Sequence, residues 1–187
     1  MKDTIRLVKL SDSEAILGIY APYIQNTAIS FEQTVPSLDE FTKRIEVISA
    51  IYPYLVYETN GRVVGYAYAY QHGSRYAYRF SVDLSIYISE AYQGTGIAKK
   101  LYDGLFEMLR NCGYVNAYAG YTNPNDKSRM FHEKYGFTHV GTYHKVGYKF
   151  GKWHDVIWVE KTIQSHTDHP EETISIKDFI KAHHSSL

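Results

Sequence analysis

A glycine-rich run, Gln93–Ala98 (QGTGIA), lies between a stretch that predicts a strand and a stretch that predicts a helix. Asp83–Ser89 alternates in the way of a strand, whereas Lys99–Cys112 carries apolar residues at helical spacing. A glycine turn that opens a helix presents free backbone N–H groups and the positive end of the helix dipole. Missing Cβ atoms let an anion come close to this backbone. The run therefore predicts an α/β chain that binds a phosphate or pyrophosphate group.

This glycine run differs from two better-known phosphate-binding loops. A P-loop has Lys-Ser or Lys-Thr directly after its last glycine, where this chain has Ile97 and Ala98. The dinucleotide motif G-x-G-x-x-G follows the first strand of a βαβ unit, whereas this run lies mid-chain and has Lys99 at the third glycine position. The sequence therefore indicates a reaction other than nucleotide hydrolysis or hydride transfer.

Length and charge exclude several classes of protein. The 187 residues suit one domain with a substantial core, and 20 Lys and Arg residues balance 20 Asp and Glu residues. Because the net charge is zero, we expect no nucleic-acid partner and no membrane binding. A single cysteine excludes an internal disulfide and fits a reducing compartment. No apolar run approaches the roughly 20 residues that span a bilayer, and the N-terminus, MKDTIRLVKL, lacks a signal-peptide core. We therefore expect a cytoplasmic globular protein.

Periodicity and turn residues predict the order β-αα-βββ-α-β-α-ββ. The first helix begins after a Ser11 or Asp12 cap and breaks or kinks at Pro22, and a capping box at Ser37–Glu40 opens the second. Asn60-Gly61 is a strong hairpin signal. The predicted strands are Ile5–Val8, Tyr54–Thr59, Arg62–Tyr70, Arg79–Ser89, Val115–Gly120, Phe137–Tyr148 and Lys152–Thr162, and the last two helices are Lys99–Cys112 and Asn125–Tyr135.

The third strand has a marked difference between its faces. In Gly65–Tyr70 (GYAYAY) the three tyrosines fall on one face and the two alanines on the other. Small side chains let a neighbouring element come close, so we expect a helix or a ligand to pack on the alanine face.

Several runs together carry a resemblance to a known family. The pattern Q-x-x-G-x-A at Gln93–Ala98 follows the fourth predicted strand, and further similar runs are PYLVYETNGRVVGYAYA, RYAYRFSVDLSIYIS, NPNDKSRMFHEKYGF and VGYKFGKWHDV. Over about residues 4–162 the chain resembles the GNAT acetyltransferases, especially the phosphinothricin and methionine sulfoximine N-acetyltransferases. This resemblance implies an α/β (α+β) fold with a mixed, mostly antiparallel sheet and helices on both faces. It also implies an acetyltransferase domain at 1–163, with a tail at 164–187 that either forms a short docking helix or is disordered.

The resemblance implies acetyl-CoA as the co-substrate and no metal. The pyrophosphate is expected at the glycine run, where the cofactor-binding residues are Gln93, Gly94, Thr95, Gly96, Ile97 and Ala98. Backbone groups of the fourth strand, at Ile86, Tyr87 and Ile88, are expected to bind the pantetheine arm. Asn125 is a candidate for binding the same arm through its amide, or an ordinary helix N-cap, or both.

Acetyl transfer to an amine needs a group that removes a proton and a group that protonates the departing thiolate. Asp83 lies where the resembling family has a glutamate proposed as general base, and it is one methylene shorter, so it acts directly or through a water. The alternative is an ion pair of Asp83 with Arg75 or Arg79. His132, four residues before Gly136, is the candidate thiolate acid, and the alternative is a histidine on the helix surface.

The acceptor side follows from the resemblance position by position. Phe31 matches an aromatic residue that lines the pocket, and Arg75 matches an arginine whose guanidinium suits an α-carboxylate. Tyr76 is a further substrate-binding candidate. The acceptor is therefore predicted to be a small-molecule amine, namely an amino acid or an analogue such as phosphinothricin or methionine sulfoximine.

The resulting prediction is an N-acetyltransferase that works by direct transfer in a ternary complex, as a homodimer. Cys112 lies at the far end of the helix that the glycine run opens, so we expect a structural thiol and no acyl-cysteine intermediate. The alternatives are a GNAT enzyme acting on a protein N-terminus, a lysine or a polyamine, or a non-catalytic acyl-CoA sensor. The tail histidines lack the further ligands of a zinc site.

Overall fold

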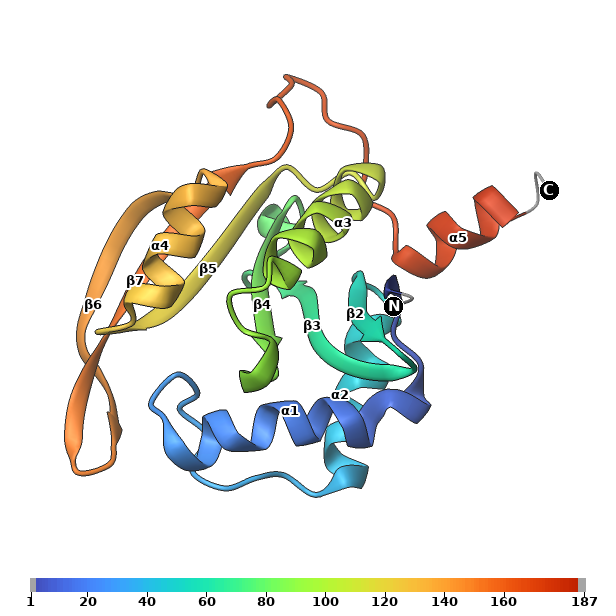
Figure 1. The fold of residues 1–187 in the computed structure, drawn as a ribbon. Helices are drawn as coiled ribbons and strands as arrows, with labels where there is room; N and C mark the ends of the chain where they lie inside the picture. Colours follow the sequence, from blue (N-terminus) through green and yellow to red (C-terminus); the bar gives the residue numbers. More distant parts are fainter. Residues whose placement is uncertain (1–2, 185–187) are drawn as a thin grey trace.

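Helices cover both faces of one mixed sheet, in the chain order that the sequence predicts (Figure 1). The computed structural model describes residues 3–184. The strands are β1 (Asp3–Leu7), β2 (Tyr54–Thr59), β3 (Arg62–Gln71), β4 (Ser81–Ile88), β5 (Asn116–Asn123), β6 (Thr138–Lys149) and β7 (Lys152–Thr162). The helices are α1 (Ser13–Asn26), α2 (Leu38–Ser49), α3 (Ile97–Asn111), α4 (Asp126–Tyr135) and α5 (Ile176–His184), with 3-10 turns η1 (Leu10–Asp12), η2 (Tyr76–Tyr78) and η3 (Glu90–Tyr92). None of the helices within residues 3–184 has the length and apolar character needed to cross a membrane.

The sheet is antiparallel except at one strand pair. Its seven strands lie in the order β1-β2-β3-β4-β5-β7-β6, which confirms the predicted mixed, mostly antiparallel sheet. The exception is β4 with β5, which pair in parallel over only Ser81–Asp83 and Asn116–Tyr118. Beyond Asp83 the two strands diverge (Figure 1). Within residues 3–184 no strand therefore pairs with this edge of β4 from Leu84 onward.

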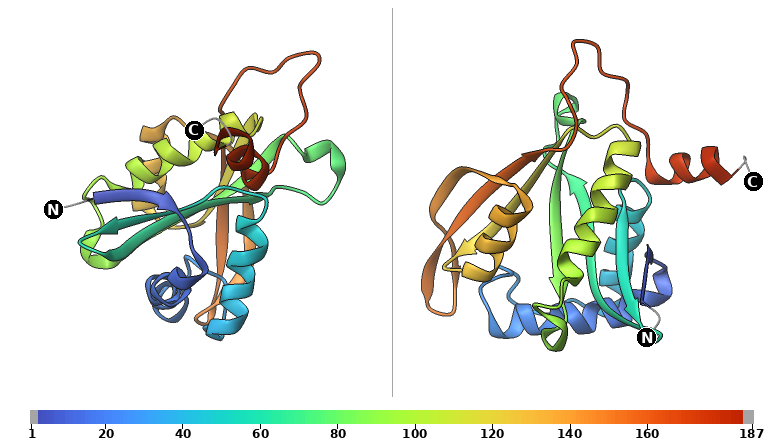
Figure 2. Two further views of the ribbon diagram at one scale, coloured as in Figure 1. Left: turned by 90° about the vertical axis from the view of Figure 1, so that its right-hand side faces the viewer. Right: turned by 45° about the horizontal axis from the view of Figure 1, so that its top comes forward.

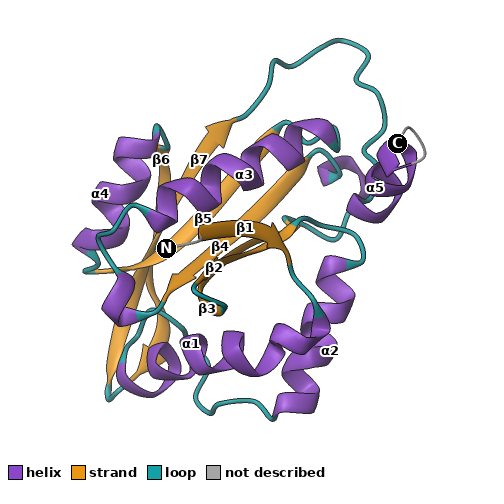
Figure 3. Ribbon diagram, turned by 45° about the vertical axis from the view of Figure 1, so that its right-hand side comes forward, coloured by secondary structure: helices purple, strands orange, loops and turns teal. Residues whose placement is uncertain are grey.

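The sheet separates two hydrophobic cores, as the alternating residues of β3 predict. Ala67 and Ala69 belong to the core beneath α3, whereas Tyr66 and Tyr68 pack in the core beneath α1 and α2. Figure 3 shows α3 and α4 on one side of the strands and α1 and α2 on the other. The alanine face thus receives a helix, because its small side chains let α3 lie close to the strand.

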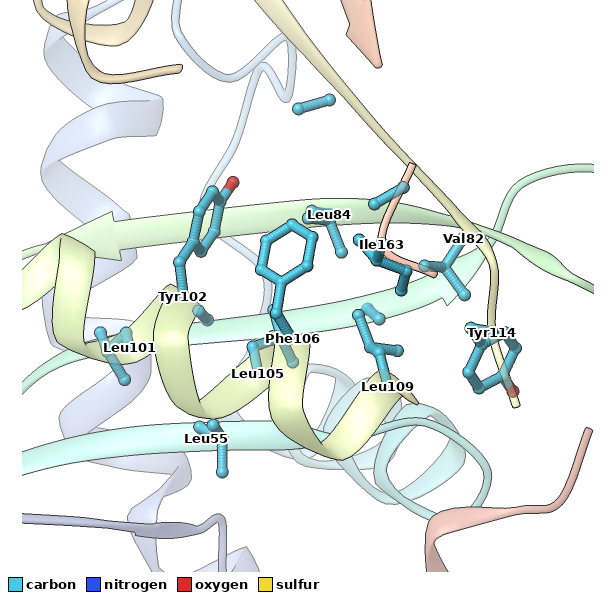
Figure 4. Packing of buried hydrophobic residues seen from close by; sticks show 14 of the residues in the cluster. Leu55, Val82, Leu84, Leu101, Tyr102, Leu105, Phe106, Leu109, Tyr114 and Ile163 are labelled. Carbon is cyan, nitrogen blue, oxygen red and sulfur yellow. The ribbon is translucent and has the colours of Figure 1, made fainter. Parts of the chain in front are cut away.

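Five buried side chains of α3 form the centre of the larger core (Figure 4). They are Leu101, Tyr102, Leu105, Phe106 and Leu109, each at most 1% exposed. Spacings of three and four residues place them on one stripe of the helix. They pack toward Leu55, Leu84 and Val82 of the sheet. Because each such side chain stabilises the fold by about 1.5–3 kcal/mol, this stripe holds the start of α3, and hence the glycine run, against the sheet.

Two tight turns confirm the predicted hairpins. Asn60 and Gly61 have φ angles of 51° and 76°, and Phe150 and Gly151 have 52° and 74°. Positive φ at both central residues is the geometry of a type I′ turn, whose twist matches that of paired strands.

Several predicted element bounds differ from the structure. Of the predicted break or kink at Pro22, the break does not occur, because α1 continues to Asn26. The carbonyl that loses its partner is that of Gly18, which is exposed and can bond to water, while Ile16, Ile19 and Ile24 hold the helix on the core. The fourth strand begins at Ser81 rather than Arg79, because the turn η2 and residues 79–80 precede it.

The segment after β7 crosses back over the molecule and ends in α5 (Figure 2). The Ile174 N–H donates to the Cys112 carbonyl and the Ile176 N–H to the Ile51 carbonyl, and the Ile176 side chain is buried. Glu172 accepts hydrogen bonds from Arg79 and from the Tyr76 hydroxyl. The tail thus contains a helix, and the first residue of that helix, Ile176, contacts the rest of the molecule. Residues 1–2 and 185–187, at the ends of the two predicted segments, lie outside the described residues.

Candidate active site

The glycine run forms a left-handed turn directly before α3. Gly94 and Gly96 have φ angles of 76° and 86°, and Gly96 is the N-cap of the helix. A Cβ at either position would meet no atom within 4 Å, so the backbone angle rather than crowding requires glycine. The first N–H groups of α3, beginning at Ile97, lack partners inside the helix. The turn thus has the free donors and the open space that an anion needs.

Gln93 joins this turn to two helices from other parts of the chain. Its amide Nε2 donates to the Tyr23 hydroxyl of α1 at 3.0 Å, and its Oε1 accepts from Lys127 Nζ of α4 at 3.0 Å. The Tyr23 hydroxyl in turn donates to the Ile88 carbonyl. Lys127 therefore places a positive charge beside the turn. Sequence reasoning missed it, because 34 residues separate Lys127 from Gln93.

The strand before the turn offers an open backbone edge. Tyr87 is partly buried and packs among tyrosines of the α1 side, with its ring 4.9 Å from that of Tyr20, whereas Ile86 and Ile88 pack on the α3 side. Their side chains thus point to the two faces, and the backbone between them faces the gap where β5 has diverged. From Asp83 to Ile88 this edge runs on the order of 16 Å at about 3.3 Å per residue.

Asp83 lies at the last position where β4 and β5 pair, and it contacts a histidine that sequence reasoning missed. His72 Nδ1 lies 2.6 Å from Asp83 Oδ1. Burial raises the pKa of the Asp83 carboxyl, and the hydrogen bond from His72 opposes this rise. Neither Arg75 nor Arg79 forms an ion pair with Asp83: Arg79 pairs with Glu172. The alternative prediction, an ion pair of Asp83 with Arg75 or Arg79, is therefore wrong, because Asp83 contacts His72 instead.

Three aromatic rings hold the imidazole of His72. The Tyr118 ring stacks on it with centroids 4.1 Å apart and an interplanar angle of 15°. Tyr78 and Trp158 contact it edge to face, with centroids at 5.8 Å and 6.5 Å. The orientation of the imidazole is thus fixed from three sides as well as by Asp83.

His72 and Asp83 line a pocket of about 380 Å³. Its wall comes from four parts of the chain and consists of His72, Gly73, Ser74, Arg75, Tyr78, Asp83, Tyr143 and Trp158. Among residues 3–184, the indole N–H of Trp158 is the one buried side-chain donor without a hydrogen-bond partner. The pocket therefore combines an acidic group, an imidazole and donors in a space that suits a small polar molecule.

The structure places the predicted acceptor residues in different surroundings. Arg75 lines the pocket, and its guanidinium forms no hydrogen bond or ion pair with any residue of 3–184. Tyr76 is 71% exposed and faces away from the pocket, where its hydroxyl donates to Glu172. Arg75 is thus available to a ligand, whereas Tyr76 contacts the C-terminal segment.

Phe31 lies apart from this pocket. Its ring covers Gly147 of β6, where a Cβ would lie only 2.2 Å from it, and its centroid is 6.1 Å from that of His154. Nearby, Lys149 Nζ donates to the carbonyls of Ile24 and Ser30. The loop between α1 and α2 is thereby fixed to the β6–β7 hairpin, and Phe31 belongs to this contact.

His132 is enclosed between α3, α4 and β5. It is 4% exposed; its Nδ1–H donates to the Ser128 carbonyl at 2.8 Å, and its Nε2 accepts from the Tyr102 hydroxyl at 3.1 Å. Burial lowers its pKa below the usual value, so the ring is neutral near pH 7. The alternative of a surface histidine is wrong, and a role in protonating the thiolate stays a prediction.

Asn125 caps α4, as one of its two predicted roles requires. Its Oδ1 accepts from the Ser128 N–H at 3.1 Å. This places Asn125 at the turn between β5 and α4, and a contact of its amide with the pantetheine arm stays a prediction.

Cys112 follows the C-terminus of α3 and is 1% exposed. Burial raises the pKa of its thiol to about 11, so the thiolate form is scarce near pH 7. Within residues 3–184 no group of three or more His, Cys, Asp and Glu side chains is placed to hold a metal ion.

Comparisons with known proteins agree with this geometry. A profile of the acetyltransferase (GNAT) domain matches residues 5–158, so the chain belongs to the GNAT acetyltransferase family. It is 34% identical over 152 residues to a phosphinothricin N-acetyltransferase of Streptomyces viridochromogenes, covering 81% of this chain and 83% of that protein. It is 33% identical over 164 residues to the L-methionine sulfoximine/L-methionine sulfone acetyltransferase of Salmonella typhimurium, covering 87% and 96%.

A solved structure shares the whole architecture. The GNAT phosphinothricin acetyltransferase of Sinorhizobium meliloti, crystallised in complex with acetyl-CoA, superposes with a TM-score of 0.87 at 32% identity. The match covers 93% of this chain and 96% of that chain. The resemblance that the sequence motifs indicate is thereby confirmed.

Proposed function

We propose that this protein transfers the acetyl group of acetyl-CoA to the amine of a small amino acid or analogue, of the phosphinothricin or methionine sulfoximine type. One observation carries the proposal. An anion-binding glycine turn and a pocket that contains Asp83 and Arg75 lie at opposite ends of the same strand, β4. A donor with a phosphate head and a long arm would lie along that strand with its reactive end at the pocket.

The residues of the donor site fit acetyl-CoA, which supplies a reactive thioester when bound. The turn Gln93–Ala98 and the start of α3 would hold the pyrophosphate, and Lys127 adds a cation beside it. The open edge of β4 at Ile86, Tyr87 and Ile88 would hydrogen-bond the amide groups of the pantetheine arm, since β5 leaves this edge unpaired. Asn125 lies at the start of α4 and is a further contact in this proposal.

The acceptor site favours a small zwitterion. Arg75 is an unpaired guanidinium at the pocket, and a guanidinium binds a carboxylate through two parallel hydrogen bonds. The ammonium group of the same molecule would then point toward the Asp83 end of the pocket. Phe31 and Tyr76 lie outside this wall, so in this proposal they act, if at all, by shaping neighbouring loops.

The transfer is direct in this proposal. Cys112 is separated from the glycine turn by the length of α3, on the order of 20 Å at about 1.5 Å per residue, and its thiol is buried and protonated. No acyl-cysteine step is therefore invoked, and donor and acceptor bind together before the acetyl group moves.

The test is a steady-state assay of coenzyme A release with a panel of acceptors. Methionine sulfone, methionine sulfoximine and phosphinothricin should be substrates, whereas the matched amine without its carboxylate should react poorly. Preference for an N-terminal peptide or a polyamine would overturn the acceptor assignment. Tight binding of acetyl-CoA without acceptor-dependent thiol release would identify a sensor instead of an enzyme.

A homodimer is part of the proposal, and it is supported by the exposed side chains of the β6–β7 hairpin. Six large apolar residues there, each more than half exposed, are Val140, Tyr143, Val146, Tyr148, Phe150 and Trp153. Such a patch is typical of an interface. Trp153→Glu should convert a dimer to a monomer in light scattering, whereas Val47→Glu, at another exposed apolar position on α2, should not. A monomeric wild-type protein would contradict the dimer.

We also propose that residues 1–163 form the catalytic domain, with 164–187 as an appended segment. We further propose that the enzyme works in the cytoplasm, because its one cysteine is a free buried thiol. Fractionation of the expressing cell tests the cytoplasmic location. No nucleic-acid or membrane partner enters the proposal.

A further inference from the structure

His72 is the strongest feature of the pocket that the proposed function leaves unused. It follows the last residue of β3, and the antiparallel register that pairs Tyr70 with Asp83 brings it beside that carboxylate. The imidazole side chain is 26% exposed and that of Asp83 is 10% exposed. The imidazole is thus the more accessible of the two groups.

The two ring nitrogens of His72 have different surroundings. Nδ1 lies 2.6 Å from Asp83 Oδ1, which fits the tautomer whose Nδ1–H donates to an ionised carboxylate. Within residues 3–184, Nε2 has no hydrogen-bond partner, and it is not among the buried unpaired atoms, of which Trp158 Nε1 is the one example. Nε2 is therefore an accessible lone pair at the pocket.

The short side chain of Asp83 makes its contact with His72 important for reaching a ligand in the pocket. The Asp83 side chain has a single methylene and is short, and one of its oxygens already accepts from His72. The imidazole would lie between this carboxylate and a ligand, so that Nε2 is one ring width from the nitrogen that contacts Asp83. Tyr118, Tyr78 and Trp158 hold that ring in place, so its orientation does not depend on the ligand.

We propose that His72 and Asp83 form a catalytic dyad in which His72 Nε2 removes the proton from the acceptor ammonium and Asp83 positions the imidazole. This proposal rests on the proposed N-acetyltransferase function. His72 would touch the substrate and is the catalytic residue, whereas Asp83 acts through it. A carboxylate that accepts from the other ring nitrogen fixes the tautomer and stabilises the imidazolium that forms.

The proton and electron balance of the step is as follows. His72 Nε2 takes one proton from R–NH₃⁺ and becomes imidazolium, which leaves a lone pair on the amine nitrogen. The amine nitrogen forms a C–N bond to the acetyl carbon, the C–S bond breaks, and the sulfur keeps its electron pair. The second nitrogen proton passes to that sulfur, which gives the amide and the free thiol. The imidazolium then loses its proton to solvent, so one proton is released per turnover.

The decisive variant is His72→Asn, because an asparagine amide can keep the donor to Asp83 and removes only the Nε2 lone pair. We expect kcat to fall by about 10²- to 10⁴-fold, the usual contribution of a general base, while the acetyl-CoA Kd from calorimetry is unchanged. Asp83→Asn should also lower kcat with little change in acceptor KM. The double variant should be no slower than His72→Asn, since residues that act as a unit are not additive. His169→Asn, an exposed histidine of the tail, is the matched control.

Rescue by imidazole separates a catalytic from a structural role. His72→Ala leaves a space beside Tyr118, and added imidazole should restore acetyl transfer in this variant but not in Asp83→Asn. Activity of His72→Asn within threefold of wild type, or the absence of rescue in a folded His72→Ala protein, would overturn the dyad and make Asp83 the base. A wild-type enzyme without acceptor-dependent thiol release would instead reject the proposed function itself.

Discussion

At the C-terminal end of β4, the proposed pyrophosphate site comes mainly from six consecutive residues, Gln93–Ala98. At the N-terminal end, the pocket comes from loops and strands that lie far apart in the sequence. The first end would bind through backbone N–H groups, whose positions follow from two left-handed glycines. The second would bind through side chains, whose positions depend on strand register and on stacking between rings. In this proposal, recognition by the backbone is local, and recognition by side chains depends on the tertiary fold.

After the His72 variants, the largest effect is expected at the acceptor end, at Arg75. Arg75→Ala removes the unpaired guanidinium, and a hydrogen bond to a charged group contributes about 1.5–3 kcal/mol. We expect kcat/KM for amino-acid acceptors to fall by about 10- to 100-fold, with acetyl-CoA affinity unchanged. Arg75→Lys should recover part of this loss. An equal loss of kcat/KM for an amine that lacks the carboxylate would show that Arg75 does not bind the carboxylate.

At the donor end, Gly96→Ala should weaken acetyl-CoA binding. A side chain at a left-handed φ costs roughly 1–2 kcal/mol, so the Kd should rise by about 5- to 30-fold while the acceptor specificity stays the same. Gly18→Ala is the matched control, because that glycine is helical and also has no neighbour within 4 Å of an added Cβ. Equal effects of the two substitutions in a calorimetric titration would contradict the assignment of the glycine turn Gln93–Ala98 as the pyrophosphate site.

The two ends should also differ in how pH acts on stability. Burial raises the pKa of Asp83, so the folded protein holds that proton more tightly than the unfolded chain, and stability falls as pH rises from about 3.8 through the folded pKa. Asp83→Asn should therefore raise the melting temperature at pH 7, on the order of 2–4 °C for each kcal/mol gained, although it should lower kcat. A lower melting temperature at pH 7 would mean that the hydrogen bond to His72 outweighs the cost of burial.

His132 should affect the pH dependence of stability in the opposite direction from Asp83. Burial lowers its pKa, so the unfolded chain binds this proton first, and stability is lost as pH falls below about 6.5. Denaturant titrations between pH 7.5 and 5 (chosen around the about 6.5 of free histidine) should show this loss in the wild type but much less in His132→Gln. An unchanged slope in the variant would assign the pH dependence to other histidines.

The smallest effect is expected where the C-terminal segment contacts the pocket loop. Glu172 binds Tyr76, which directly follows Arg75, and Arg79, which directly follows Tyr78 of the pocket wall. An exposed ion pair is screened by solvent and contributes little to stability, so Glu172→Gln should raise the acceptor KM only by about 1.5- to 5-fold without changing acetyl-CoA affinity. Glu46→Gln, which breaks an exposed pair with Lys43 on α2, is the control and should change neither constant.

Much of the donor end could be predicted from the sequence, because its signals are local. Left-handed glycines, the helix that follows and the alternating strand before it all lie within one short run of residues. The alanine and tyrosine faces of β3 were predictable for the same reason, since alternation in a strand fixes which side each residue faces.

The acceptor end could be predicted only in part. Arg75 and Asp83 were identified one by one through the family resemblance, and the structure brings both to one pocket. His72 was missed, because a lone histidine after a strand carries no local signal and its partner is 11 residues away across a hairpin. Tyr76 was assigned to the pocket, but a 3-10 turn directs it toward Glu172. Such directions depend on loop geometry that spacing does not determine.

The short parallel pairing of β4 with β5 has a mechanical consequence. Three positions on each strand join a half-sheet of β1–β4 to a half-sheet of β5–β7, and Asp83 is the last of them. Any change in the angle between the two half-sheets would therefore turn about this junction, which lies beside Asp83 and His72. A donor lying in the opening beyond Asp83 would brace the two halves, and amide hydrogen exchange at Leu84–Ile88 should slow when acetyl-CoA binds. Loading the donor would thus stiffen the platform on which the proton is transferred.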